Sequence, residues 1–202
     1  RIGIIGINGT GKSTLLKILA GLEPPDEGAI ACNPNLKMVY LPQNPVMNDN
    51  FTVLEQVFED FSPESRELNA YEAKAMLNRL GIKNFDVKIS TLSGGQRKRV
   101  ALATTLIHPS DILILGEPTS HLDSYMVCWL EQYLIRFSGG IIMVTHDRYF
   151  LERVVNHITE LSNSKLYSYE ANYSKYLELK AQRAEMTEAS ERKRQTILRR
   201  EY

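Results

Sequence analysis

Hydrophobic residues along this chain gather into short runs rich in Ile, Leu and Val, and each run is followed by polar or glycine-rich residues. Runs of this kind are typical of strands buried in a parallel sheet. Shorter runs and alternating segments of β-branched and aromatic residues indicate additional, less buried strands. The pattern predicts strands at residues 2–5, 29–31, 37–41, 111–115 and 140–145, and a hairpin at 158–161 and 165–169.

Helical composition fills several of the segments between these strands. Residues 15–20 follow the first strand after a glycine-rich turn, and residues 51–80 predict a compact helical insert that Gly81 ends. Within the insert, Thr52 and Glu55 have the spacing of a capping box, and the Ser62-Pro63 pair separates two helices. A long polar helix is expected to start at about residue 172.

A glycine-rich turn joins the first strand to the first helix, and it has the spacing of a phosphate-binding loop. Residues 6–13 read Gly-x-x-x-x-Gly-Lys-Ser. Glycines let several backbone N–H groups face one polyphosphate, and the helix adds its positive end. Lys12 can reach the β- and γ-phosphates, and the Ser13 hydroxyl can bind Mg²⁺. The alternative is a plain strand-to-helix turn with a surface lysine.

Composition narrows the class of protein without identifying a partner. The chain has 202 residues, and its 24 Lys and Arg balance its 24 Asp and Glu, so overall charge is no argument for nucleic acid or membrane. Two cysteines far apart, Cys32 and Cys128, favour a reducing compartment over a disulfide framework. We find no run long enough to span a bilayer and expect a cytoplasmic chain; its start at Arg1, directly before a strand, predicts a fragment.

Polar residues at three strand ends are candidates for ligand binding or catalysis. Gln43, Glu117 and His146 each follow a predicted strand, where ligands of parallel sheets bind. Glu117 could act as a general base or position a water molecule. The alternatives are a solvated loop glutamine and a structural histidine.

A second anion site could lie at Ser93-Gly94-Gly95, which opens a predicted helix with free N–H groups and a hydroxyl. Without the nearby phosphate loop, this segment would be only a helix start.

In order and spacing, these motifs together resemble the set that defines ATP-binding-cassette (ABC) ATPases. The resemblance covers nearly the whole chain. It implies an α/β, RecA-like P-loop NTPase core with a small antiparallel β part and a helical subdomain. The boundaries it implies are 1–43 and 91–161 for the core, 44–90 for the helical subdomain, 162–180 for a hairpin and helix start, and 181–202 for the start of a charged linker helix.

Residues 145–151 and 169–178 look like the ABC-F subfamily, whose members are soluble, carry two cassettes in one chain and bind ribosomes. The chain is similar to a first cassette of the Uup-like kind. The short connection at 61–70 leaves no room for the long arm that some members carry.

The resemblance also implies roles for individual residues. Ser13 and Gln43 would bind Mg²⁺. Glu117 would polarise the attacking water, and His146 would sense the γ-phosphate. Ser93, Gly94 and Gly95 would act on ATP held by a second cassette, in the same full-length chain or in a homodimer. The residues expected to contact ATP are Gly6, Asn8, Gly9, Thr10, Gly11, Lys12, Ser13, Thr14, Ser93, Gly94, Gly95, Gln96 and Asp123.

Two departures from the family pattern affect these expectations. The strand before Glu117 ends in Gly116, where the family has an aspartate that organises the Mg²⁺ shell. The aromatic residue that usually stacks on adenine would lie upstream of Arg1.

Three functions remain open at this point. The first is an ATPase switch acting on the ribosome, the second is the ATPase subunit of a membrane transporter, and the third, motivated by Gly116, is an ATP-binding module that hydrolyses poorly. Five basic residues, Arg192, Lys193, Arg194, Arg199 and Arg200, could contact ribosomal RNA or form a solvated helix face.

Overall fold

The computed structural model describes residues 1–201, and the side chains at position 191 and at positions 193–201 lie outside that description. Its centre is a six-stranded sheet with the order β2-β3-β4-β1-β5-β6. The strands are β1 (Ile2–Gly6), β2 (Met38–Leu41), β3 (Ile112–Gly116), β4 (Gly140–Val144), β5 (His157–Ser162) and β6 (Lys165–Tyr169).

The first five strands pair in parallel, and β6 pairs with β5 in antiparallel. The carboxyl ends of β1, β2, β3 and β4 therefore meet at one edge of the sheet, as the sequence pattern predicts. The mixed α/β class is confirmed.

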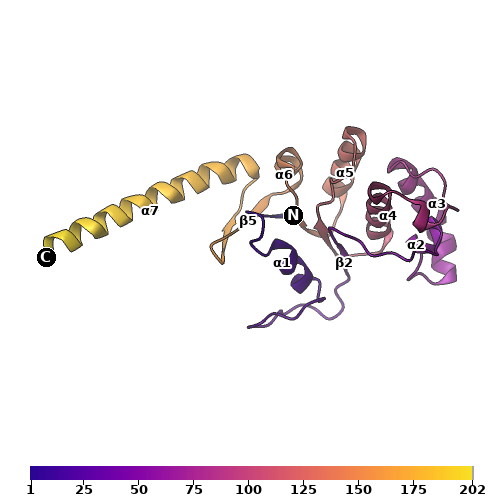
Figure 1. Cartoon of the computed structure of the whole chain (residues 1–202), viewed down its shortest axis with the longest axis horizontal. Coiled ribbons are helices and arrows are strands. Elements are labelled where there is room, and N and C mark those ends of the chain that lie inside the picture. Colours follow the sequence, from indigo (N-terminus) through magenta and orange to yellow (C-terminus); the bar gives the residue numbers. More distant parts are fainter. Residues whose placement is uncertain (202) are drawn as a thin grey trace.

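Helices cover both faces of the sheet, because its strands are apolar on both sides. Helix α1 (Lys12–Leu19) lies on one face, where Leu16 packs with Ile4, Ile114 and Val144. On the other face lie α4 (Gly94–Ile107), α5 (Ser124–Arg136) and α6 (Arg148–Val154) (Figure 1). Successive residues of a strand point to opposite faces, so Leu113 and Leu115 join this second core.

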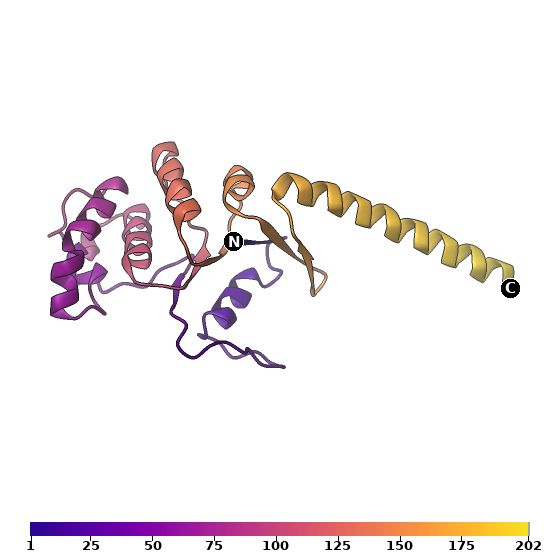
Figure 2. The same ribbon diagram turned by 180° about the vertical axis from the view of Figure 1, so that it is seen from behind.

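The helical insert lies at the end of the molecule next to α4 (Figure 2). It consists of α2 (Val53–Val57), α3 (Pro63–Arg79) and the 3₁₀ turn η1 (Ile89–Thr91). The predicted capping box is present, with Glu55 N–H donating to Thr52 Oγ1 and Thr52 N–H donating to Glu55 Oε2. Ser62 caps α3 and Pro63 is its first residue, so the predicted separation of the two helices is confirmed.

Helix α7 (Tyr173–Glu201) extends away from the opposite end of the molecule (Figure 1). Its first turns are attached to the sheet through Glu160 of β5, which Lys180 and Arg183 contact at 2.6 and 3.2 Å. Of the basic cluster, Arg192 is described and lies 3.5 Å from Glu188. The side chains of Lys193, Arg194, Arg199 and Arg200 lie outside the described residues.

One predicted strand is wrong. Residues 29–31 are exposed and irregular, and no strand is described between β1 and β2. Three residues with no pairing partner cannot form a ladder, so the run of small apolar residues had no sheet to join. In the described residues, antiparallel strand pairing is limited to the β5–β6 hairpin and an isolated bridge between Thr52 and Lys88.

No helix among the described residues is both long enough and apolar enough to cross a bilayer.

Candidate active site

The phosphate loop connects β1 to α1 with the backbone that its glycines permit. Gly9 and Gly11 have φ angles of 83° and 96°, in the left-handed region that side chains disfavour. Thr10 closes the turn, since its Oγ1 donates to the Ile7 carbonyl over 2.8 Å. Gly6 has another reason to be glycine, because a Cβ there would lie 2.6 Å from the Leu161 carbonyl oxygen.

Lys12 is folded against the loop itself. The residue is 8% exposed, and Nζ donates to the carbonyls of Gly6 and Ile7 over 2.8 and 2.9 Å. Helix α1 has no acidic residue in its first turn, so its positive end is not neutralised locally. The loop therefore combines one ammonium group with a free helix N-terminus, which suits a polyphosphate.

A cavity of about 470 Å³ lies beside this loop. Three sequence-predicted residues from other strand ends, Gln43, Glu117 and His146, face the same space as Lys12 and Ser13. The full lining is Asn8, Gly9, Gly11, Lys12, Ser13, Thr14, Gln43, Glu117, Val144 and His146. The structure thus brings together residues separated by more than a hundred positions.

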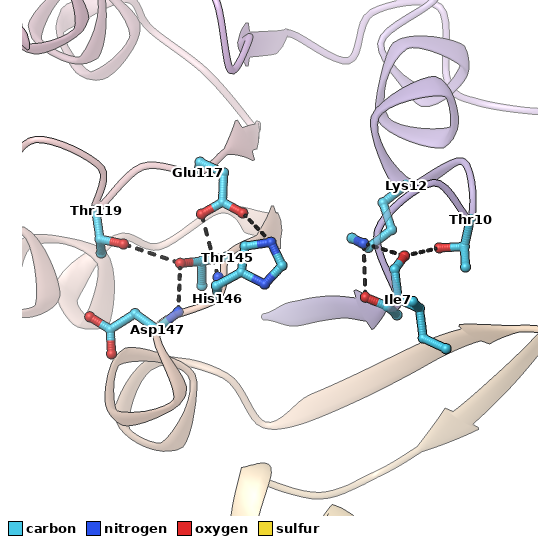
Figure 3. A network of polar contacts seen from close by, with 9 residues as sticks. Ile7, Thr10, Lys12, Glu117, Thr119, Thr145, His146 and Asp147 are labelled. Carbon is cyan, nitrogen blue, oxygen red and sulfur yellow. Dashed lines mark hydrogen bonds and ion pairs between the residues drawn. The ribbon is translucent and has the colours of Figure 1, made fainter.

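Glu117 and His146 form a pair across the ends of β3 and β4 (Figure 3). His146 Nε2 lies 3.4 Å from Glu117 Oε1, and the His146 backbone N–H lies 3.4 Å from Oε2. Glu117 has φ 53°, which is strained for a glutamate, and its N–H donates to the Val144 carbonyl over 2.8 Å. The Glu117 side chain is 14% exposed, whereas that of His146 is 65% exposed.

The predicted second anion site does not reach this cavity. Ser93 and Gln96 form a capping box at the start of α4, and Gly95 approaches the ring of His121. Asp123 caps α5 by accepting from the Met126 N–H over 2.9 Å. The ATP-contact candidates that do not line the cavity are Gly6, Thr10, Ser93, Gly94, Gly95, Gln96 and Asp123.

The donor set fits Mg²⁺ together with a polyphosphate, and it suits no all-protein metal site. Ser13, Gln43 and Glu117 supply oxygen atoms, the ligands that Mg²⁺ prefers. Among the described residues no cluster of three or more His, Cys, Asp or Glu could hold a metal. Phosphate oxygens would have to complete the shell, because Gly116 contributes none.

Two residues near Glu117 and His146 were not predicted from the sequence as part of the site. Thr119 and Thr145 approach within 3.1 Å of each other through their hydroxyl oxygens. The sequence does show a hydroxyl residue close to the end of each strand. That the two hydroxyls contact each other depends on the loops after β3 and β4 being neighbours, which the sequence does not show.

Comparison with known proteins decides the family. A family profile described as ABC transporter matches residues 1–120. The chain belongs to the ATP-binding-cassette family. A second profile with the same description matches residues 159–202 of the cassette.

The cassette has curated relatives that match its whole length. It is 42% identical to YfmR, an uncharacterized ABC transporter ATP-binding protein of Bacillus subtilis, and 36% identical to the energy-dependent translational throttle protein EttA of Escherichia coli K12. The match covers 38% of YfmR and 43% of EttA. The chain therefore spans less than half the length of these relatives.

Two solved structures have a fold similar to that of this chain. The RNase-L Inhibitor matches with a TM-score of 0.68 and 31% identity over 83% of the cassette and 33% of that chain. A dimeric ATP-binding cassette bound to ADP and phosphate after hydrolysis matches with a TM-score of 0.69 and 25% identity over 84% of each chain. The RecA-like P-loop fold of ABC nucleotide-binding domains is thus confirmed.

Proposed function

We propose that this chain is one ATP-binding and ATP-hydrolysing cassette of a two-cassette ABC-F protein that acts in translation. The observation that carries the proposal is the cavity in which the phosphate loop, Gln43, Glu117 and His146 converge. Such a cavity offers cationic and N–H groups for phosphates on one side and a carboxylate on the other.

Binding rests on the phosphate loop. Its backbone N–H groups and the N-terminus of α1 hold the phosphate oxygens, and Lys12 exchanges its two carbonyl partners for the phosphate charge. Ser13 and Gln43 would hold Mg²⁺, which neutralises phosphate charge as it develops.

Hydrolysis rests on the pair opposite the loop. Glu117 orients a water molecule and takes a proton from it, and its low exposure keeps bulk water from competing for the carboxylate. His146 lies beside Glu117 and donates toward the transferring phosphoryl group. We assign these two residues the catalytic roles.

A second cassette completes the site. Ser93, Gly94, Gly95, Gln96 and Asp123 lie away from the cavity of their own chain. Placed over the cavity of another cassette, the N-terminus of α4 would supply N–H groups to the exposed side of the phosphates. The second cassette would come from the same full-length chain or from a homodimer.

The role in translation is supported by the relatives. EttA is called a translational throttle, and one matching structure, 31% identical to the cassette, is titled as a complex of an archaeal ribosomal stalk protein with the ribosome recycling factor aABCE1. We assign this protein to the Uup-like group of ABC-F, to the cytoplasm and to the ribosome, with the basic cluster from Arg192 to Arg200 on ribosomal RNA. The connection between α2 and α3 spans residues 58–62, not the predicted 61–70, because residues from Pro63 onward belong to α3. A connection this short supports a member that lacks a long arm.

Sedimentation of the full-length gene product tests this proposal. We expect it to pellet with ribosomes in the presence of ATP and to hydrolyse ATP. Binding through basic residues should also weaken steeply with salt. Recovery with membranes would favour the transporter subunit, and ribosome binding without turnover would favour a switch that works by ATP occupancy. Unchanged binding after the five basic residues are replaced by Gln would remove the RNA role of the cluster.

A further inference from the structure

We propose that Thr145 and Thr119 are positioning residues that keep Glu117 and His146 in fixed positions relative to each other. This inference rests on the proposed ATPase function. Neither threonine lines the 470 Å³ cavity that holds Gln43 and Glu117. Thr145 lines a second cavity, of about 320 Å³, on the other side of Lys12 and His146, which line both cavities. Their hydroxyls join the loop after β3 to the loop after β4, and these two loops carry the proposed catalytic pair.

Thr145 is the centre of this link. It follows β4 directly and is 4% exposed. Its Oγ1 accepts from the Asp147 N–H over 3.1 Å and lies 3.1 Å from Thr119 Oγ1 (Figure 3). A hydroxyl has one donor and two lone pairs, so Thr145 can make both contacts at once. Buried hydroxyls without partners are costly, which favours this arrangement.

The β4 side of the link fixes the position of His146. Asp147 caps α6, since its Oδ1 accepts from the Phe150 N–H over 3.0 Å. Thr145 in turn holds Asp147 through its backbone N–H. His146 therefore lies between one residue anchored in the sheet and one anchored on a helix.

The β3 side of the link fixes the loop that begins with Glu117. Thr119 lies two residues beyond Glu117, and its carbonyl accepts from the Leu122 N–H over 3.3 Å. The Ser120 N–H donates to the Glu117 carbonyl over 3.2 Å. A tight turn thus connects Thr119 to the strained backbone of Glu117. A displacement of Thr119 therefore also displaces Glu117.

The pair needs such support because its own contacts are weak. Both Glu117–His146 distances are 3.4 Å, beyond a good hydrogen bond, and the imidazole is largely exposed. Side-chain contacts alone would leave the ring free to turn. Catalytic groups must stay within about 0.5 Å of their productive geometry, and a 1 Å displacement can cost about 10²-fold in rate.

Valine variants test the link, because valine keeps the shape of threonine and removes the hydroxyl. Turnover is measured in the full-length protein with the second cassette made inactive. We expect Thr145→Val and Thr119→Val each to lower kcat about tenfold with little change in KM for ATP. Serine variants at both positions should restore kcat. The double valine variant should be no slower than the slower single variant, because both changes break one link.

Thr105→Val is the matched control. Thr105 is also a buried threonine, 5% exposed, but its hydroxyl bonds only to the Ala101 carbonyl within α4. Loss of stability alone would affect this variant as well. The melting temperature of each variant is recorded, and rates are compared well below it. Thr119 is less buried than Thr145, so Thr119→Val still tests the link if Thr145→Val fails to fold.

Proton NMR of the His146 ring gives a readout that needs no hydrolysis. The ring signal is assigned by its loss in His146→Gln. We expect Thr145→Val and Thr119→Val to shift this signal and Thr105→Val to leave it unchanged. An inactive parent would contradict the proposed function, and the NMR comparison alone would then decide the positioning role. Parent-like kcat and an unmoved His146 signal in both valine variants would overturn the proposal.

Discussion

At the residue scale, Lys12 concentrates the positive charge of the site. It is the only lysine or arginine among the described residues that line the cavity. We expect Lys12→Ala to lose most of its affinity for a non-hydrolysable ATP analogue, by about 10- to 100-fold, because one charge-assisted hydrogen bond to phosphate is removed. Calorimetry measures the change.

Lys17→Ala is a suitable control for Lys12→Ala. Lys17 lies on the same helix but pairs with Glu23 over 2.8 Å, outside the cavity. Equal losses in both variants, or tight binding by Lys12→Ala, would contradict the assignment of the phosphate loop.

Gly116 also belongs to the residue scale, because the resemblance to ABC ATPases predicts an aspartate at its position. A Cβ on Gly116 would lie 3.0 Å from the Leu41 carbonyl oxygen and 3.1 Å from the Gln43 nitrogen. Both are backbone atoms of the neighbouring strand end, so any side chain has to displace them slightly. An added carboxylate would then supply the missing oxygen ligand for Mg²⁺.

Comparing two variants separates these effects. We expect Gly116→Ala to lower the melting temperature and the ATPase rate, because it adds only crowding. Gly116→Asp should turn over faster than Gly116→Ala and faster than the parent, and it should need less Mg²⁺ for half-maximal rate. Titration of the rate with Mg²⁺ measures this. If Gly116→Asp matched Gly116→Ala in both quantities, the missing carboxylate would not limit the reaction.

At the element scale, the buried carboxylate of Glu160 helps to hold α7 on the sheet. The Glu160 side chain is 6% exposed, and its charge is balanced by Lys180 and Arg183, both from α7. Arg183 also stacks on the Tyr167 ring, with its guanidinium 3.7 Å from the ring centre. Glu160 pairs in register with Ile5, next to the residue where the phosphate loop begins. The start of α7 is thereby attached to the strand that carries the loop.

We expect replacement of Lys180 and Arg183 together by Met to destabilise the chain by roughly 1–3 kcal/mol. A buried unpaired charge can cost more, but the two cationic side chains are 46% and 35% exposed, so water screens part of the effect. Chemical denaturation measures the loss.

Adding Glu160→Gln to the double variant should recover much of the lost stability. Lys175→Met, at an exposed ion pair with Glu178, should change stability little. A triple variant as unstable as the double would argue against the buried charge as the cause.

At the scale of the whole molecule, stability should fall in alkaline solution. Burial raises the pKa of Tyr176, and the hydrogen bond from Lys180 to Glu160 raises the pKa of Lys180. The folded chain therefore keeps protons that the unfolded chain releases near its ordinary values of 10.0 and 10.5. The resulting stabilisation is complete below pH 10 and is lost as the pH rises through the raised values.

Melting temperatures between pH 8 and 11 check this expectation. Tyr176→Phe should flatten the fall above pH 10, whereas Tyr149→Phe, at a position 79% exposed, should follow the parent. A parent whose melting temperature stays constant to pH 11 would contradict the assignment.

The proposed reaction cycle also belongs to the whole molecule, because in this proposal a second cassette completes each site. We expect Glu117→Gln in the full-length protein to slow hydrolysis at this site by about 10²-fold or more while ATP still binds, since the amide keeps the shape and loses the base. ATP should then hold the two cassettes together. Small-angle scattering with and without ATP measures closure, and unchanged turnover with the second cassette inactive would show that Glu117 is not the base.

The sequence by itself determined the elements whose signals are local. Runs of Ile, Leu and Val located β1, β3 and β4, glycine spacing located the phosphate loop, and the Thr52–Glu55 spacing located a helix start, because each depends on residues within a few positions of one another. The polar strand ends could be placed near the loop for the same reason, since parallel strands end at one edge. The roles assigned to Gln43, Glu117 and His146 stay predictions.

Only the tertiary structure decided the features that depend on distant pairs. The left-handed backbone of Glu117 is held by the carbonyl of Val144, and the link between Thr119 and Thr145 crosses 26 positions. The α7 attachment likewise joins Glu160 to Arg183, and the rejected strand at 29–31 lacked a partner that no local pattern could reveal. A periodic pattern reports which face of an element is buried, whereas hydrogen bonds between loops depend on which strands become neighbours. Sheet order is set by the packing of the whole chain, and for this reason these contacts appeared only in three dimensions.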